Sequence, residues 1–400
     1  MGGYAQSITD LVLESAESEP AGLSLSAVCD PNLKAHAERV ATLQDRGIEV
    51  YDSFEKMLEH PGLDAVWLPV PIDLHLPFTE AALKAGKAVM LEKPVCGTID
   101  EFDRLIRARD TANLPVLVGF QDIYDASTYP LKRHLLSGDL GELEQVSVRC
   151  CWPRTDAYFC RADWAGKIRH RGTWVLDSPV NNAMAHFVNL TLFLLGPTEN
   201  SSGVPASLEA ELYRAAKIEN YDTASLRIQL QDGPRVQVLM THACDKPDGP
   251  IIEIKGSRGS IYRTNGQSRV EIDGRVVQDE KINVYRRIDM LKAFARTVRG
   301  EQIDRQFLAT LEVARSHTLV VNAASQAASI KTVPDDQIKV LDWDESSVRA
   351  IPHIDEIFAD CAAKNQMLHE SERLSFTEPA SSIELTGYDS FAGIAEELRA

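Results

Sequence analysis

The chain has 400 residues, enough for two domains with sizeable cores, and its 44% of hydrophobic residues is typical of globular proteins. The formal net charge of −17 argues against nucleic acid or an anionic membrane as a partner. No cysteine spacing matches a zinc site and no signal peptide is recognisable, so we expect a cytoplasmic protein with reduced thiols and no metal centre. The longest apolar run, Leu190 to Leu195, is too short to span a bilayer.

Residues 1–120 alternate short apolar strands with helical stretches. This alternation predicts βαβ units and a parallel sheet, as in a Rossmann-type dinucleotide-binding domain. The expected strands are 23–29, 48–51, 65–70, 88–91 and 115–120, and the expected helices are one around Ile8 and Val12, then 34–46, 54–59, 77–85 and one that begins after Thr98.

The most informative motif in this region is Glu92-Lys93-Pro94, directly after the strand 88–91. Pro94 ends the strand because it has no N–H to donate. Thr98 and Glu101 form a capping box that starts the next helix. Glu92 and Lys93 therefore lie at the carboxyl end of a strand, where open α/β sheets bind ligands. A surface ion pair is the alternative interpretation.

A doubly wound nucleotide domain begins with a strand, a glycine-rich turn and a helix, but this chain begins at the turn, with Gly2-Gly3-Tyr4-Ala5. We expect residues 2–5 to be the end of a G-x-G-x-x-[GA] motif and to contact the cofactor. Asp30 ends the next strand about 25 positions later, near the roughly 20 expected for a ribose-binding acid. A carboxylate there repels a 2′-phosphate, which favours NAD over NADP. Terminal disorder for Gly2-Gly3 and a helix N-cap for Asp30 are the alternatives.

The absent first strand has a physical consequence, because it would lie inside a sheet of order 3-2-1-4-5-6. Without it, buried backbone groups lose partners at about 1–3 kcal/mol each, against a total stability of about 5–15 kcal/mol. We therefore hypothesise that the working protein begins about ten residues before Met1. Restoring those residues is expected to raise the melting temperature by several degrees.

From about 121 to 335 the pattern predicts an α+β domain for substrate binding and oligomerisation, with a large, mostly antiparallel, open sheet. Its exposed face suits another subunit, so we expect a homodimer or homotetramer. Residues 336–400 form a C-terminal extension to which the sequence assigns no role; a cap on the sheet and a subunit arm are the two options that we consider. The expected strands are 143–152, 206–213, 223–230, 236–241, 251–255, 260–262 and 270–272, and the expected helices are 129–136, 181–195, 285–298 and 304–327.

Several motifs together resemble the glucose–fructose oxidoreductase, inositol dehydrogenase and rhizopine-catabolism family (Gfo/Idh/MocA). The most specific is Glu92-Lys93-Pro94 with its upstream context, and the others are Leu63 to Val66, Pro71 with His75, Ala81 to Leu83, Gly86-Lys87, Val118 to Phe120, Ser137 to Glu142, and His186 to Gly196. The resemblance covers about residues 1–330. It implies a dinucleotide domain, a second domain with an open sheet, bound NAD or NADP, and oxidation or reduction at a sugar or polyol carbon.

The chain departs from this family at its reactive helix. The family carries D-x-x-x-H with a further Asp three residues on, where this chain has Asn182, His186 and Asn189. Positions i and i+4 share a helix face, so Asn182 and His186 are expected to point into the cleft together. Asn can orient an imidazole but cannot compensate its charge, and Asp177 is placed to return a carboxylate to the site. The family's Arg after Gly119-Phe120 is replaced here by Gln121-Asp122-Ile123.

By the resemblance, Lys93 is the leading catalytic candidate, beside the nicotinamide ribose and the substrate hydroxyl, where it donates a hydrogen bond and shares proton transfer. Glu92 orients Lys93, and His186 accepts the hydroxyl proton with Asn182 beside it. Two further residues are expected to shape the cofactor cleft, Pro71 and His75. Structural roles remain the alternatives for His186, packed between domains, and for His75.

The stretch 161–171 is basic and aromatic inside an acidic protein, and it precedes the reactive helix. Arg and Trp side chains near a cleft suit a polyhydroxylated or anionic substrate. A solvated loop is the alternative for each of these side chains. The expected substrate contacts are Trp164, Lys167, Arg169 and His170, together with Asn182 and His186.

These observations lead us to expect an NAD(P)-dependent oxidoreductase that transfers a hydride between nicotinamide and a sugar, polyol or sugar-derivative carbon. Two alternatives remain open. NAD-dependent glycosidases share the fold and turn over glycosides without net NADH. A non-catalytic sugar- or nucleotide-binding relative is suggested by the two Asn substitutions and the absent strand.

Overall fold

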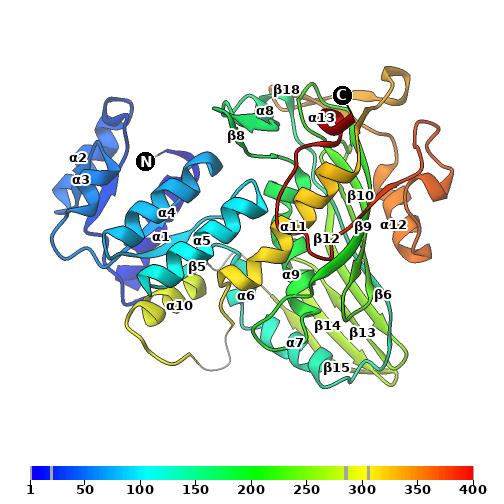
Figure 1. The fold of residues 1–400 in the computed structure, drawn as a ribbon, viewed down its shortest axis with the longest axis horizontal. Helices are drawn as coiled ribbons and strands as arrows, with labels where there is room; N and C mark the ends of the chain where they lie inside the picture. Colours follow the sequence, from blue (N-terminus) through cyan, green and yellow to red (C-terminus); the bar gives the residue numbers. More distant parts are fainter. Residues whose placement is uncertain (1, 19–20, 283–286, 304–306, 400) are drawn as a thin grey trace.

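The computed structural model describes residues 2–18, 21–282, 287–303 and 307–399. An α/β unit formed by the N-terminal part of the chain lies beside a larger unit built on one wide sheet (Figure 1). The α/β unit confirms the predicted alternation of strands and helices. Its strands are β1 (Ala27–Cys29), β2 (Glu49–Tyr51), β3 (Ala65–Leu68), β4 (Ala88–Leu91) and β5 (Val116–Val118), and its helices are α1 (Gly3–Ser18), α2 (Ala37–Asp45), α3 (Phe54–Leu58), α4 (His75–Lys84) and α5 (Ile99–Ala112).

The parallel sheet of this unit is interrupted between β1 and β3. β1 pairs with β2, and β3, β4 and β5 form a separate three-stranded sheet. Within the described residues no ladder joins β1 to β3. In the doubly wound order 3-2-1-4-5-6, the first strand, which is the strand absent from this chain, lies between the strands that correspond to β1 and β3. The hypothesis of a longer N-terminus remains a prediction.

Apolar side chains connect the two halves of the sheet. Leu23 and Leu25 precede β1 and belong to one cluster with Trp67 of β3, Val12 of α1 and Leu291. The strand predicted for 23–29 is shorter in the structure, because only its last three residues pair with β2.

The larger unit contains a ten-stranded sheet in the order β15-β14-β13-β12-β6-β11-β10-β9-β16, with β19 also paired to β9. Its neighbours are antiparallel except β6 with β11 and β9 with β16, which confirms the mostly antiparallel sheet. The sequence reading missed β15, β16 and β19. The strands are β6 (Leu143–Cys151), β9 (Pro205–Arg214), β10 (Thr223–Leu230), β11 (Arg235–Thr241), β12 (Asp248–Gly256), β13 (Gly259–Arg263), β14 (Gln267–Ile272), β15 (Arg275–Lys281), β16 (Ile330–Thr332) and β19 (Ser381–Glu384).

Helices cover one face of this sheet and link the two units (Figure 1). α11 packs against α5 and β5 on one side and against α9 and β9 on the other, while α10 packs against α1. Parts of the helices predicted for 285–298 and 304–327 lie outside the described residues. The helices are α6 (Gln121–Tyr124), α7 (Thr128–Leu136), α8 (Asp156–Phe159), α9 (Ala185–Leu194), α10 (Ile288–Val298) and α11 (Leu311–Ala327), and the short strands β7 (Arg169–His170) and β8 (Thr173–Trp174) form a small hairpin.

The prediction of one helix over 181–195 was wrong, because the structure divides it. Pro179–Ala183 forms a single π-helical turn, capped by Ser178, whose hydroxyl accepts a hydrogen bond from the Asn181 N–H at 3.2 Å. Met184 leaves the helical conformation with φ −111° and ψ 8°, and α9 begins after it. Asn182 and His186 therefore do not occupy one continuous helix face.

The C-terminal extension covers the face of the sheet that was expected to be open. α12 (Ile354–Lys364) lies on the side opposite α9 and α11 (Figure 1), and Phe358 packs in one cluster with Tyr213 of β9 and Leu239 of β11. The extension is thus a cap, as one of the two predictions had it. The prediction that this face of the sheet is open was wrong over β6, β9, β10 and β11. The expected homodimer or homotetramer remains a prediction. Its other elements are β17 (Lys339–Trp343), β18 (Ser346–Ala350) and α13 (Ala395–Arg399).

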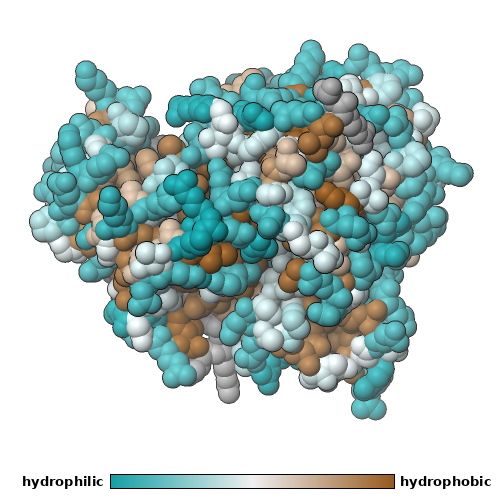
Figure 2. Space-filling view, viewed as in Figure 1, coloured by the Kyte–Doolittle hydropathy of each residue, from teal (hydrophilic) through white to brown (hydrophobic). Residues whose placement is uncertain are grey.

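Hydrophilic residues dominate the face of the molecule in Figure 2, and apolar residues show only in scattered patches there. Of the helices in the described part of the chain, none is both long and apolar enough to cross a membrane.

Candidate functional site

Lys93 lies where the two units meet. It follows β4, and its ammonium donates hydrogen bonds to the backbone carbonyl of Asn182 at 2.8 Å and to its side-chain oxygen at 3.1 Å. Burial lowers the pKa of Lys93, and the positive charges of Arg161 and Arg154 add to this, while Glu92 and Asp177 oppose it. Lys93 thus lies at the carboxyl end of β4, as the motif predicted, and contacts Asn182 of the larger unit.

Glu92 is 4% exposed and does not form the surface ion pair that was the alternative. Its carboxylate accepts hydrogen bonds from the indole N–H of Trp67 at 3.0 Å, the hydroxyl of Tyr4 at 3.3 Å and the backbone N–H of Lys93 at 3.3 Å. A Cβ at Gly119 would lie 2.7 Å from Glu92 Oε2, so only glycine fits there. Glu92 thus fixes the backbone of Lys93 rather than its ammonium.

α11 forms hydrogen bonds with the turn that follows Lys93 and with the π-helical turn that contains Asn182. The side-chain oxygen of Asn322 accepts from the backbone N–H of Ile99 at 2.8 Å, and its amide donates to the Gly97 carbonyl at 2.8 Å. These bonds fasten the turn between Lys93 and α5, whose capping box of Thr98 and Glu101 is confirmed. His317 Nε2 lies 2.9 Å from the Val180 carbonyl in the π-helical turn.

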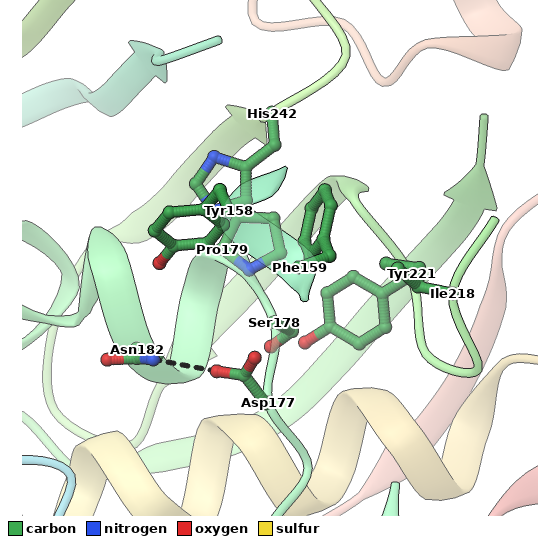
Figure 3. Close-up of a pocket in the computed structure, with 9 residues that line it drawn as sticks. All are labelled: Tyr158, Phe159, Asp177, Ser178, Pro179, Asn182, Ile218, Tyr221 and His242. Carbon is green, nitrogen blue, oxygen red and sulfur yellow. Dashed lines mark hydrogen bonds between the residues drawn. The ribbon is translucent and has the colours of Figure 1, made fainter. Parts of the chain in front are cut away.

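Asp177 returns a carboxylate to the site through Asn182. The Asn182 amide donates to Asp177 Oδ1 at 2.7 Å (Figure 3), and the Gly166 N–H donates to Oδ2 at 2.6 Å. Burial raises the pKa of Asp177, while these two hydrogen bonds lower it. The three side chains form one chain of contacts, from the Lys93 ammonium through the Asn182 side chain to the Asp177 carboxylate.

His186 faces a carboxylate that the sequence reading did not assign. Its Nδ1 lies 3.5 Å from Asp122 Oδ2, and the Phe120 ring packs edge-on against the imidazole with centroids 5.8 Å apart. Burial, with the nearby charges of Lys93 and His317, holds the pKa of His186 well below its usual value. Burial also raises the pKa of Asp122 to about 6, although Arg263 opposes the rise. Burial and these charges thus disfavour the protonated form of the His186 imidazole.

A pocket forms where the parallel strands β6 and β11 end. Figure 3 shows Tyr158, Phe159 and His242 on one side and the Asp177–Asn182 pair on the other. The strand ends are tied together, because the Trp152 N–H donates to the Thr241 carbonyl at 3.0 Å and His242 Nδ1 lies 2.9 Å from the Trp152 carbonyl. The remaining lining residues are Ser178, Pro179, Ile218 and Tyr221.

The predicted cofactor residues fit a dinucleotide through their backbone. α1 begins at Gly3, so the first N–H groups of this 16-residue helix have no acceptor within it and suit a pyrophosphate. Gly3 has φ +55°, and a Cβ at Gly2 would lie 3.0 Å from the His36 ring, so glycine suits both positions. Asp30 directly follows β1, where its Oδ1 accepts a hydrogen bond from the Asn32 N–H at 2.9 Å; the N-cap of the following turn is Asn32 rather than Asp30.

His75 has a structural place. The ring is 1% exposed, Nδ1 lies 2.9 Å from the Pro94 carbonyl, and Nε2 lies 2.9 Å from the Val70 carbonyl. It thereby ties the loop at Pro71 to the turn after Lys93. Pro71 itself precedes the 3-10 turn Ile72–Leu74 at the carboxyl end of β3.

Of the residues expected to bind substrate, Asn182 lines the pocket, whereas the four residues of the stretch 161–171 do not. Lys167 Nζ lies 3.8 Å from Glu219, and Arg169 pairs with Glu397 at 3.1 Å. His170 Nδ1 lies 3.2 Å from Asp73, across the junction of the two units. Trp164 stacks with the Arg161 guanidinium at 4.9 Å from its ring centroid.

Sequence reasoning missed four residues that the structure brings to the site. Two of them could have been suspected from the sequence: Asp122 lies in the segment that replaces the family's Arg, and Arg154 lies just before the basic stretch. Tyr221 and His242 had no such signal, since each follows an ordinary strand-and-loop pattern and reaches the pocket through the sheet topology.

The comparisons with known proteins agree with this architecture. A model of the GFO/IDH/MocA oxidoreductase family with an NAD-binding Rossmann fold matches residues 3–120, and a model of the GFO/IDH/MocA C-terminal domain matches residues 130–262. The WlbA dehydrogenase from Bordetella pertussis, solved with NADH and UDP-GlcNAcA, shares the fold, with a TM-score of 0.64 at 21% identity over 80% of this chain and 92% of that one.

Two curated relatives come from Bacillus subtilis. A scyllo-inositol 2-dehydrogenase named for NADP(+) is 26% identical over 235 residues, 58% of this chain and 61% of that protein. One named for NAD(+) is 32% identical over 249 residues, 60% of this chain and 66% of that protein. The chain thus spans just under two thirds of the length of these relatives. Because both of its domains match models of one family, the chain belongs to the GFO/IDH/MocA oxidoreductases.

Proposed function

We propose that the chain is an NAD(P)-dependent oxidoreductase that transfers a hydride between nicotinamide and a CH–OH carbon of a sugar, polyol or sugar derivative. The observation that carries this proposal is the position of Lys93, bound to Asn182 at 2.8 Å and 3.1 Å at the junction of the two units. The names of the inositol dehydrogenase relatives support the substrate class.

Lys93 acts on the substrate hydroxyl. An ammonium has three protons, and two of those of Lys93 are bonded to Asn182, so the third is available to a substrate oxygen. The Asp177 carboxylate polarises the Asn182 amide and so holds the oxygen that orients Lys93. A partly buried lysine with a lowered pKa is suited to share a proton with an alcohol.

His186 accepts the hydroxyl proton when the alcohol is oxidised. Its Nδ1 faces Asp122, so we assign Nε2 as the proton acceptor. Asp122 then compensates the imidazolium charge, the part played in the family by carboxylates whose positions are Asn182 and Asn189 here.

The first turn of α1, Gly2 and Asp30 would hold the cofactor, with Pro71 lining its cleft. Bound NAD supplies the hydride acceptor at its nicotinamide ring. We keep the expectation of NAD in preference to NADP on the charge of Asp30.

A thermal-shift titration with NAD and with NADP tests the cofactor. Stabilisation by NAD that follows RT ln(1 + [L]/Kd), and is weaker with NADP, is expected. A sugar and polyol screen for NADH formation then tests the reaction. Turnover of a glycoside without NADH would indicate the glycosidase alternative, and cofactor binding without any turnover would indicate a binding relative.

Lys93→Met tests the catalytic assignment. We expect kcat to fall about 10²–10⁴-fold, the range for loss of a positioned proton-transfer group, while the NAD thermal shift stays. Lys84→Met, at an exposed position of α4, is the matched control and should leave both unchanged. An active Lys93→Met variant would contradict the assignment.

A further inference from the structure

We propose that the pocket at the ends of β6 and β11 belongs to the substrate site, that Arg154 and Arg161 around Tyr158 form an anion subsite beside it, and that the substrate is therefore a polyhydroxylated compound with a carboxylate or phosphate group. This inference rests on the proposed function, since it names the class of substrate for the same site.

The two guanidinium groups converge on one ring of the pocket wall. The Arg161 guanidinium lies 3.7 Å from the Tyr158 ring centroid and that of Arg154 lies 4.7 Å from it. Backbone contacts fix both residues: Arg161 Nη1 donates to the Tyr158 carbonyl at 2.8 Å, and the Arg154 N–H donates to the His242 carbonyl at 3.2 Å. Tyr158 itself lines the pocket opposite Asp177 and Asn182 (Figure 3).

Neither guanidinium has an ion-pair partner within the described residues. This separates them from Lys167 and Arg169 of the same loop, which pair with Glu219 and Glu397. In addition, the Nε of Arg154 is buried and makes no hydrogen bond in the described part of the chain. A buried, unpaired guanidinium nitrogen costs free energy, and an anionic ligand would offset that cost.

The positive charges of Arg154 and Arg161 act electrostatically on Lys93. They lower the pKa of Lys93, after the larger effect of burial, and Arg154 also contributes, after burial, to lowering the pKa of His242 to about 3. Asp177 is the one carboxylate among the residues that line the pocket, and it is already bonded to Asn182 and Gly166. An acidic protein of net charge −17 thus presents cations without counter-ions at its pocket.

The chemistry of these groups selects an oxyanion. Guanidinium groups bind carboxylate and phosphate oxygens through paired, planar hydrogen bonds. Asn182, on the other side of the pocket, and Lys93, which is bonded to Asn182, suit hydroxyl groups. A ligand that satisfies both sides carries hydroxyls at one end and an anionic group at the other.

Matched sets of ligands test the subsite at constant ionic strength, both with and without added NADH. Glucose, glucuronate and glucose 6-phosphate differ only at C6, and sorbitol, L-gulonate and sorbitol 6-phosphate, which differ only at the corresponding carbon, form a second set. We expect at least one acid to bind with a Kd at least about tenfold lower than its neutral counterpart. Preference for the carboxylate or for the phosphate member identifies the source of the charge.

Arg154→Gln and Arg161→Gln should each raise the Kd of the acid about tenfold or more and leave that of the neutral compound unchanged. Arg235→Gln, exposed at the opposite end of β11, is the matched control and should change neither. Equal binding of acids and neutral compounds, binding of neither, or acid binding that survives both substitutions would overturn the subsite. The separate NAD titration reports on the proposed function, so absence of an NAD shift with retained acid binding would overturn that function alone.

Discussion

The site has its carboxylate at residue 177 rather than at residue 182, and this difference determines its hydrogen bonds. Asn182 contributes both an acceptor to Lys93 and a donor to Asp177, which an aspartate in its place cannot do. The exchange of Asp for Asn relative to the family pattern is therefore matched by a nearby carboxylate rather than being a simple loss.

Asn182→Asp tests these hydrogen bonds. The new carboxylate would face Asp177 Oδ1, which lies 2.7 Å from the present amide, so two like charges would share one contact. We expect kcat to fall and the free energy of unfolding to drop by about 1–3 kcal/mol. The double variant Asn182→Asp/Asp177→Asn restores a donor–acceptor pair and should recover both. If the single variant is as active and stable as the wild type, the contact is unimportant.

Asp122 links the site to the pH dependence of stability. Its pKa is raised to about 6, above the ordinary 3.8, so its contribution to stability is full below about pH 4 and is lost as the pH rises through about 6. Asp122→Asn removes this loss. Between pH 4.5 and pH 7 the unfolding free energy of the variant should therefore change by about 1–3 kcal/mol in the stabilising direction relative to the wild type. If urea unfolding gave the same pH dependence of the unfolding free energy for the variant and the wild type, the raised pKa of Asp122 would be contradicted.

At the scale of elements, α9 is stabilised at its C-terminal end by a lysine from α7. The Lys132 side chain is fully buried and its ammonium donates to the carbonyls of Phe193, Gly196 and Ser201. The ammonium also lies 4.6 Å from the centroid of the Phe193 ring. Because α9 carries His186, this contact helps to position the proton acceptor.

Lys132→Met keeps the volume of the side chain and removes its charge. The three carbonyls would lose their donor, and we expect the free energy of unfolding to fall by about 2–4 kcal/mol. Arg133→Met, the neighbouring exposed position, is the matched control and should leave the melting temperature nearly unchanged. Equal melting temperatures for the two variants would show that the carbonyls find other partners.

For the whole molecule, the C-terminal extension completes the large sheet. Gln237 of β11 donates to the Cys361 carbonyl at 3.5 Å, Arg227 of β10 pairs with Glu370 at 2.5 Å, and His369 lies 2.9 Å from Glu211 of β9. These polar contacts surround the apolar cluster under α12. The extension therefore occupies the surface on which the oligomer was expected to form.

Phe358→Ala tests this cap. Phe358 is fully buried between α12 and the sheet, and its truncation should cost about 3–5 kcal/mol of unfolding free energy. Hydrogen exchange of β11 amides should accelerate at the same time. Glu356→Ala, exposed on the same helix, should change neither, and slow exchange in Phe358→Ala would show that the sheet does not depend on the extension.

The local sequence by itself determined the βαβ alternation, the β4–Lys93 turn and the capping box of Thr98, because strand patterns, proline and caps act within a few residues of each other. It did not predict the break at Met184, because the apolar spacing continues across it. The strands β16 and β19 were not predicted for another reason: short polar segments become strands only when the edge of an existing sheet pairs with them.

The tertiary structure alone decided which distant groups meet. Asp122 reaches His186 and His170 reaches Asp73 through the order of strands and the path of loops, which no spacing in the sequence encodes. The ion pairs of Lys167 and Arg169 were likewise decided by partners far along the chain. Residue types with a local signature are thus readable from the sequence, whereas a site assembled from several elements depends on the packing that brings them together.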